Sequence, residues 1–185
     1  MNPFALTEEF AGPEQPSGLA PIHEDDLGSW SAPFVMATIN TKNIHRSNYL
    51  QDHAYGENFV YDEMLLTGPG EQGETIANAV ANDKSMAKSE LQPGDGPSKE
   101  ERDNGNYDVM FVGSNDSGYK VVASVKGDKD PGYGSTSKMI AEAAVCLALD
   151  PEAAGGGIWT PAAALGSALI DRLQDNAGLS FQKEG

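Results

Sequence analysis

The stretch YDVMFVGSNDSGYKVVASVKG, residues 107–127, decides the fold. Two runs rich in β-branched and aromatic residues, 107–113 and 119–127, flank the short loop SNDSG. A glycine-containing loop of this length between two such runs is typical of a β-hairpin, whose strands pair antiparallel. The sequence therefore predicts a hairpin at the centre of the sheet.

Three further elements are expected before the hairpin. Residues 31–50 favour a helix, because Ser31 can serve as its N-cap and Pro33 falls in the first turn, where a missing N–H costs nothing. Residues 58–67, NFVYDEMLLT, are rich in aromatic and aliphatic side chains and predict a strand. Residues 74–88 predict a second helix with few apolar side chains to support it.

Two helices are expected after the hairpin. The first begins at residue 135 or 136 and ends near residue 149. The second has Thr160 as N-cap and Pro161 at its first position, and it ends near Asn176. Strands and helices in this order indicate an α+β fold: a mostly antiparallel or mixed sheet with a central hairpin, packed against about four helices.

Two polar stretches limit the compact part of the chain. Residues 1–30 carry four prolines and six acidic side chains, with no lysine or arginine before Lys42, and residues 89–106 are rich in glycine, proline and charge. Such composition buries little apolar surface. The sequence therefore predicts an N-terminal strap over 1–30 and one α+β domain over 31–185, which contains a polar loop at 89–106.

Composition and charge exclude several classes of function. The 12 basic and 28 acidic residues give a net charge of −16, which repels phosphate backbones and anionic headgroups and argues against binding nucleic acid or membrane surfaces. Cys146 is the single cysteine, and the three histidines are scattered, so neither a disulfide nor a zinc site is expected. The longest apolar run, 143–149, is too short to span a bilayer, and no signal peptide is evident, so a cytoplasmic location is expected.

One stretch matches the dinucleotide fingerprint G-x-G-x-x-G. GPGEQG places its glycines at Gly68, Gly70 and Gly73, between a predicted strand and a predicted helix. However, Pro69 fills a position in the tight turn, and two glutamates add negative charge at the helix start, where a pyrophosphate would bind. We interpret the glycines as a chance match and expect no cofactor there.

The segment that follows the hairpin is a candidate anion-binding site. Its candidate residues are Lys126, Tyr133, Ser135, Thr136 and Lys138. A helix start with free N–H groups, hydroxyls and nearby lysines can bind a carboxylate or a phosphate. The alternative is that Ser135 or Thr136 only caps the helix and that the lysines are solvated.

A second candidate lies at the end of the predicted helix 31–50, where Asn43, Arg46 and Ser47 gather. Arg46 continues an apolar stripe, so its guanidinium could hold a substrate carboxylate or phosphate at the rim. Equally, a cation near a helix C-terminus complements the helix dipole and needs no ligand. Several tyrosines and acids, Tyr61 and Glu63 among them, could transfer protons, but the sequence gives none of them a partner, and no catalytic residue follows from it.

Several longer motifs carry a resemblance to a known family. They are NPFAL, W-x-x-PFVM-x-x-IN-T-x-x-I-x-RSN, YG-x-x-F-x-YDEM, PG-x-GPSKEER, GD-x-DPGYGSTSKMIAEAA and GGIWTPAAALGSALIDRLQDNAGLSF, in that order along the chain. Together they resemble the C-terminal region of saccharopine dehydrogenase-like oxidoreductases, which include trans-acting enoyl reductases. The resemblance covers nearly the whole chain.

The resemblance implies a function that this chain performs only with help. In the intact family NAD(P) sits on an N-terminal Rossmann domain, and the matched region forms a second α/β domain that faces the cofactor cleft. The chain is thus expected to bind no cofactor alone and to be the substrate-binding and oligomerisation half of an oxidoreductase. Its partner would be a Rossmann-domain half on another chain, or a second copy of itself. Family substrates range from amino-acid adducts to unsaturated acyl chains.

Two alternatives remain at this point. The chain could be a non-catalytic binding or assembly module that kept the fold and lost the chemistry. It could also be an independent nucleotide-binding protein that uses the glycines of 68–73.

Overall fold

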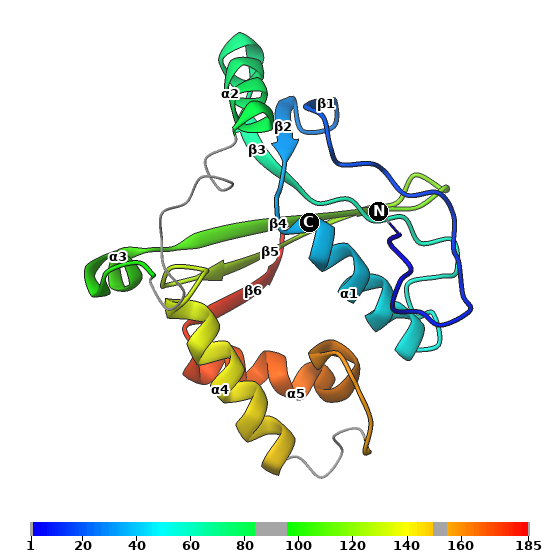
Figure 1. Ribbon diagram of the computed structural model, residues 1–185, viewed down its shortest axis with the longest axis vertical. Coiled ribbons are helices and arrows are strands. Elements are labelled where there is room, and N and C mark those ends of the chain that lie inside the picture. Colours follow the sequence, from blue (N-terminus) through cyan, green and yellow to red (C-terminus); the bar gives the residue numbers. More distant parts are fainter. Residues whose placement is uncertain (1, 84–95, 150–154, 185) are drawn as a thin grey trace. The chain divides into compact units, whose positions relative to one another are not determined.

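The structure is a computed structural model that describes residues 2–83, 96–149 and 155–184 (Figure 1). The chain forms two compact units, residues 1–90 and 91–185. Helices and two three-stranded antiparallel sheets make up the described part. The predicted α+β class with mostly antiparallel pairing is therefore confirmed, although the strands form two sheets. The sequence predicted a boundary at residue 31, between a strap and one domain, whereas the two compact units divide the chain after residue 90. The predicted division stays a prediction.

The first unit is built on a sheet in the order β1-β2-β3. Its strands are β1 (Ile22–Glu24), β2 (Ser29–Pro33) and β3 (Met64–Gly68), and both pairs are antiparallel. Helix α2 (Gly70–Asn82) contacts β2 and β3, and helix α1 (Ala37–Leu50) lies between β2 and β3 in the chain.

The helix predicted over 31–50 begins later than the sequence indicated. Ser31 and Pro33 lie in β2, and α1 starts only after Met36, so the predicted N-cap and first turn are wrong. The residue before a proline avoids the helical region and prefers extended backbone, which here favours a strand. Ser31 and Ala32 are completely buried in the sheet. That burial stabilises the extended form of a stretch whose local pattern suits a helix start equally well.

The strand predicted over 58–67 is shorter, because a side chain replaces its partner. Only its end forms β3. Farther upstream, the Gln15 amide donates to the Phe59 carbonyl at 3.2 Å and accepts from the Tyr61 N–H at 2.9 Å. These are the bonds that a neighbouring strand would make. Gln15 lies 46 residues from Tyr61 in sequence, so local patterns cannot reveal the replacement.

The N-terminal segment packs on α1 and is more ordered than its composition indicates. Thr7 is completely buried, and its hydroxyl oxygen lies 2.9 Å from the Phe4 carbonyl oxygen and 2.8 Å from the Phe10 carbonyl oxygen, between which its one hydrogen is shared. The Phe4 ring lies 4.5 Å from the ring of His45 on α1, centroid to centroid. Burial lowers the pKa of His45, which favours the neutral ring in this apolar setting. Residues 22–24 of the same segment form β1, which the composition did not predict.

The second unit contains the predicted hairpin. Strands β4 (Tyr107–Ser114) and β5 (Lys120–Gly127) pair antiparallel, with Tyr107 opposite Gly127 and Ser114 opposite Lys120. β6 (Leu179–Lys183), which the sequence analysis missed, pairs with the other side of β5. The sheet order is therefore β4-β5-β6, and one strand of the predicted hairpin lies at its centre (Figure 1).

A short helix interrupts the predicted polar loop at 89–106. Within the described residues of that loop, 96–106, α3 spans Lys99–Asn104; residues 89–95 lie outside the described part. Ser98 accepts from the Glu101 N–H, and the Glu101 carboxylate accepts from the Ser98 N–H, so the two form a capping box. The expectation of an unstructured loop is wrong here because these two bonds satisfy the donors of the first turn.

Helices α4 (Gly134–Leu149) and α5 (Pro161–Asn176) contact each other and complete the unit. Both predicted spans are confirmed to within a residue or two, although Gly166, with φ +50° and ψ −135°, interrupts the helical backbone inside α5. The predicted helix at 74–88 starts earlier, as α2, and its residues 84–88 lie outside the described part. The core of the second unit joins α5 and β6 through Leu173, Ala177 and Leu179. None of the described helices is long and apolar enough to cross a membrane.

Candidate apolar binding site between helices α4 and α5

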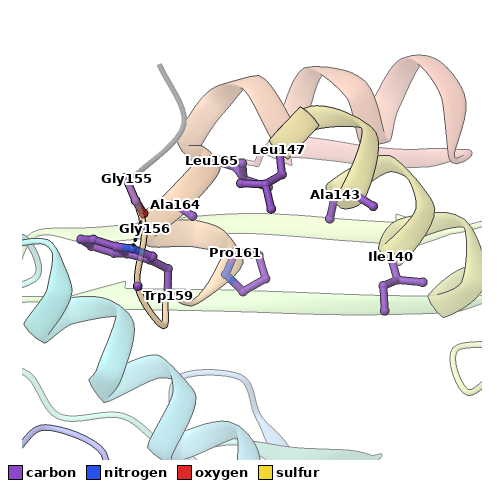
Figure 2. A pocket seen from close by; sticks show the side chains of 11 residues that line it. Ile140, Ala143, Leu147, Gly155, Gly156, Trp159, Pro161, Ala164 and Leu165 are labelled. Carbon is purple, nitrogen blue, oxygen red and sulfur yellow. Dashed lines mark hydrogen bonds between the residues drawn. The ribbon is translucent and has the colours of Figure 1, made fainter. Parts of the chain in front are cut away.

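A pocket of about 540 Å³ opens between α4, the start of α5 and the glycine loop before it (Figure 2). Its lining is almost entirely apolar and comprises Ile140, Ala143, Ala144, Leu147, Gly155, Gly156, Gly157, Trp159, Pro161, Ala164 and Leu165. A volume of this size lies within the range of small-molecule binding sites, about 300–1,000 Å³.

The helical period explains how the sequence forms this pocket. Ile140, Ala143 and Leu147 lie at positions i, i+3 and i+7 of α4 and share one face. Pro161 and Leu165 lie one turn apart on α5 and form the opposite wall. Between them stand alanines and glycines, whose small size leaves the space open. Ile140 is 69% exposed and Leu147 56%, so large apolar groups at the mouth are available to a ligand.

The glycine loop is fastened by Trp159. Its indole N–H donates to the Gly155 carbonyl at 3.0 Å, and Figure 2 shows the ring alongside Gly156 with this bond dashed. Gly157 has a φ of +150°, and a Cβ there would lie 2.9 Å from the Trp159 Nε1. A side chain at 157 would therefore clash with the ring that closes the loop. The wall of the pocket is thus a turn held against an aromatic ring.

The lining sets limits on the chemistry of the pocket. It contains no ionisable side chain among the described residues. Burial of alkyl groups can stabilise a bound chain by about 0.8 kcal/mol per CH₂, but nothing in the lining can donate or accept a proton during a reaction. The arrangement suits the recognition of an apolar group and does not suit catalysis on its own.

The predicted anion site at the start of α4 is filled by the chain itself. The Asp130 carboxylate accepts hydrogen bonds from the backbone N–H groups of Gly132, Tyr133 and Gly134. These are the donors that an external anion would need. Burial opposes ionisation of Asp130, but the three backbone bonds outweigh it and hold its pKa below the ordinary value. Asp130 is not among the residues predicted for this site, although the Asp-Pro-Gly pattern that precedes the helix is typical of an Asx-turn.

The remaining residues of that predicted site also have partners within the chain. The Lys126 ammonium lies 2.8 Å from Asp108, its cross-strand neighbour, and the Lys138 ammonium lies 2.6 Å from Asp128. Ser135 is completely buried, and its hydroxyl lies 2.9 Å from the Tyr107 hydroxyl. The hydroxyl of the adjacent threonine, Thr136, donates to the Pro131 carbonyl. The structure brings Tyr133, Ser135, Thr136 and Lys138 to one helix start, whereas Lys126 projects from β5. Anion binding here stays a prediction.

The second predicted site lies in the first unit and holds the N-terminal segment. The Arg46 guanidinium donates to the Leu6 carbonyl at 2.9 Å and lies 3.9 Å from the Glu8 carboxylate. The Ser47 hydroxyl donates to the Asn43 carbonyl one turn earlier. The Asn43 amide donates to the Ile39 carbonyl at 3.3 Å. The three residues do share one end of α1, as predicted, but all three make contacts within the chain. A role in ligand binding stays a prediction.

A second cavity, of about 890 Å³, lies in the first unit beside Tyr61. The Tyr61 hydroxyl donates to the Glu63 carboxylate at 3.3 Å, and the Asn40 amide donates to the other oxygen of that carboxylate at 2.9 Å. Burial and the nearby negative charge of Glu63 raise the pKa of Tyr61, which keeps its hydroxyl protonated. The structure thus supplies the partner that the sequence could not assign to this tyrosine.

The glycines of 68–73 have a packing role in the structure. Gly68 ends β3 and Gly70 begins α2, both with positive φ. A Cβ on Gly73 would lie 1.9 Å from the Gly68 carbonyl oxygen, so only glycine lets the helix approach the strand. β3 pairs antiparallel with β2, unlike the parallel strands of dinucleotide-binding folds. The interpretation as a chance match stays a prediction.

Comparison with known proteins connects this chain to one group of enzymes. It is 35% identical to a candidate trans-acting enoyl reductase of Mycobacterium tuberculosis over 174 residues, or 84% of this chain and 41% of that protein. It is 30% identical to a trans-acting enoyl reductase of Mycobacterium bovis (strain BCG / Pasteur 1173P2) over 93% of this chain and 47% of that protein. A trans-acting enoyl reductase of Mycobacterium ulcerans is 31% identical over 79% of this chain.

The chain is similar to trans-acting enoyl reductases. It spans less than half the length of the curated relatives it matches. No protein-family model matches it, and no solved structure matches it.

The pocket between α4 and α5 is the feature of this enoyl reductase-like chain that sequence reasoning missed. The lining residues other than Gly155 fall within quoted motifs or predicted helices, but no single stretch contains both walls. Alanines and glycines at helical spacing are the only available signal, and that signal is common in ordinary helix packing. Among the described residues no group of histidine, cysteine or carboxylate side chains could hold a metal ion.

Proposed function

We propose that this chain is the substrate-binding and oligomerisation half of an NAD(P)-dependent, enoyl reductase-like oxidoreductase of the saccharopine dehydrogenase-like family, and that it is inactive alone. The observation that carries the proposal is the pocket between α4 and α5, whose lining side chains are almost entirely apolar and include no ionisable group. The similarity to trans-acting enoyl reductases over less than half of their length supports it.

The reaction requires two parts, and the described residues suit only one of them. Reduction of an enoyl group adds a hydride and a proton to a carbon–carbon double bond, and a nicotinamide cofactor supplies the hydride. Dinucleotides bind where free N–H groups at a helix start meet a pyrophosphate beside a parallel sheet. Here the N–H groups before α4 are bonded to Asp130, and every described strand pair is antiparallel. Among the described residues neither the start of α4 nor the strand pairing offers such a site, so we propose that the cofactor binds to another segment or another chain.

The role of this half would be to hold the apolar part of the substrate. An alkyl chain in the pocket would contact Ile140, Leu147 and Trp159. Binding energy from a part of the substrate that does not react can orient the part that does, which raises the rate without chemistry in the pocket itself. Recognition and hydride transfer are thus assigned to different parts of the enzyme.

A chimera tests this assignment. The matched segment of the M. tuberculosis relative would be replaced by this chain, and NADPH oxidation followed with a long-chain 2-enoyl thioester. We expect turnover by the chimera and none by the chain alone. Turnover by the chain alone would contradict the proposal. A folded chimera that binds NADPH but reduces nothing would favour the alternative, a non-catalytic module.

A matched pair of variants in the chimera isolates the pocket. Ala143→Trp fills the pocket, whereas Ala141→Trp adds the same bulk at an exposed position of α4 outside it. The first variant is expected to lose turnover of long-chain substrates and to keep turnover of short ones, because only long chains reach the pocket. The second is expected to behave like the unmodified chimera.

A further inference from the structure

Strand β4 has one free edge in the described part of the chain. It pairs with β5 on one side only, and no other described strand pairs with it. The backbone N–H and C=O groups along such an edge can bond to another strand, which makes an unprotected edge a template for association. The edge is eight residues long, enough for a ladder of several bonds.

The side chains of β4 are apolar on both faces. Val109 and Phe111 project to one face of the sheet, and Met110 and Val112 project to the other, because side chains alternate along a strand. Each of the four is 40–45% exposed. An occupant of the edge must therefore also present apolar side chains on both of its faces. A water-exposed segment with one polar face would leave one of these pairs uncovered.

The opposite edge of the same sheet ends in polar and charged side chains. β6 ends in exposed Gln182 and Lys183, and Glu184 continues alongside β5, where its N–H donates to the Val122 carbonyl at 2.8 Å and its carboxylate accepts from the Ser124 hydroxyl at 2.5 Å. Charged residues at an edge oppose pairing with another strand. β4 contains no lysine, arginine or proline, and its one charge, Asp108, is paired with Lys126 at 2.8 Å.

We propose that two copies of this chain pair through their β4 edges, antiparallel about a twofold axis, into one continuous six-stranded sheet. The β4 strand of a second copy is a suitable occupant of this edge, because it also has apolar side chains on both faces. In the symmetric register Phe111 stands across from its counterpart, and Met110 stands across from Val112 of the second copy. This rests on the oligomerisation part of the proposed function and gives it a surface and a partner.

The net charge sets a second property of the dimer. Each copy carries −16, so two copies repel each other, while the β4 edge itself is close to neutral. Added salt screens that repulsion over distances beyond about 8–10 Å and leaves the apolar contact intact. Association is therefore expected to strengthen as salt is raised, whereas an interface made of ion pairs would weaken.

Sedimentation equilibrium of the full chain tests the proposal. We expect a dimer. Its dissociation constant should rise about tenfold or more in Phe111→Lys, because each copy then brings one positive charge to the β4–β4 contact. Val60→Lys adds the same charge at a 51% exposed valine of the first unit, outside β4, and should leave association unchanged. A monomeric wild-type chain, or a dimer that persists unchanged in Phe111→Lys, would overturn the proposal.

Hydrogen exchange on the wild-type chain provides a test that needs no variant. The amides of β4 are expected to be protected at concentrations above the dissociation constant and to exchange faster after dilution below it. A dimer whose β4 amides exchange equally fast at both concentrations would refute β4 as the interface. Neither result affects the binding of acyl chains, because the pocket lies between α4 and α5, so failure of this inference can be told apart from failure of the proposed function.

Discussion

The two ends of helix α4 offer opposite kinds of binding surface. At its start, hydroxyls, lysines and backbone N–H groups suggest an anion site, yet the Asp130 carboxylate accepts the N–H groups of residues 132–134, and Lys138 pairs with Asp128. One to three turns later, Ile140 and Leu147 are largely exposed beside an open pocket. Polar groups are easy to recognise in a sequence, but when the fold gives them hydrogen-bond partners they are no longer available to a ligand. The exposed apolar side chains around the pocket remain available to bind one.

The largest expected effect comes from filling the pocket beside the C-terminal part of α4. Ala143→Trp should weaken binding of a long-chain acyl thioester about tenfold or more, because excluding two CH₂ groups forfeits about 0.8 kcal/mol each. Isothermal titration of the isolated chain measures it. Ala141→Trp serves as the control on the exposed face of α4, and an equal loss in that control would show that the helix, not the pocket, had been disturbed.

Loosening the pocket wall should have a smaller effect. Trp159→Phe keeps an aromatic ring but removes the indole N–H that bonds the Gly155 carbonyl. Loss of one such bond, at about 1 kcal/mol, corresponds to about fivefold weaker acyl binding. The same titration provides the measurement. Unchanged affinity would mean that the glycine loop needs no fastening to form the wall.

The helix start of α4 can be made available to an external anion by removing the Asp130 carboxylate. Asp130→Ala frees the N–H groups of Gly132, Tyr133 and Gly134 while the helix start and its lysines remain. Inorganic phosphate is then expected to raise the Tm of the variant by about 2–4 °C and to leave the wild-type Tm unchanged. Differential scanning calorimetry in phosphate and in a chloride buffer of equal ionic strength makes the comparison. A wild-type chain that phosphate stabilises would contradict a closed site.

The smallest effect is a dependence of stability on pH. The folded-state pKa of Asp130 lies below its ordinary value of 3.8, so its contribution is present above that value and is lost as the pH falls through the folded-state pKa. Wild type should therefore lose more stability between about pH 4 and pH 2 than Asp130→Asn, which has no proton to gain. Chemical unfolding at these pH values measures the difference. Parallel curves for the two proteins would remove Asp130 from the account.

Elements with local signals were predictable from the sequence. The hairpin follows from two β-rich runs around a short glycine loop, and α5 follows from Thr160 and Pro161 at its start. The capping box of α3 was equally local, since Ser98 and Glu101 have the required spacing. It was missed because the polar composition around it favoured a loop.

Elements that depend on distant partners were not predictable. Gln15 takes the backbone bonds of residues 59–61 from across the sequence, and burial of Ser31 in the sheet decides between strand and helix. The pocket needs two helices and a loop brought together. Of the candidate site residues, those on α1 lie together, and so do those at the start of α4, whereas Lys126 lies on β5. Local patterns could not reveal internal partners such as Leu6.

The central claim is that this chain binds the apolar part of the substrate and that the cofactor binds elsewhere. A pair of titrations on one sample of the chain tests it most directly. Saturated acyl thioesters of increasing length, followed by Trp159 fluorescence in a Trp30→Phe background, should bind about fourfold more tightly for each added CH₂ until the pocket is full. NADPH, followed by its own fluorescence, should show no saturable binding. Affinity independent of chain length, together with saturable NADPH binding, would contradict the account.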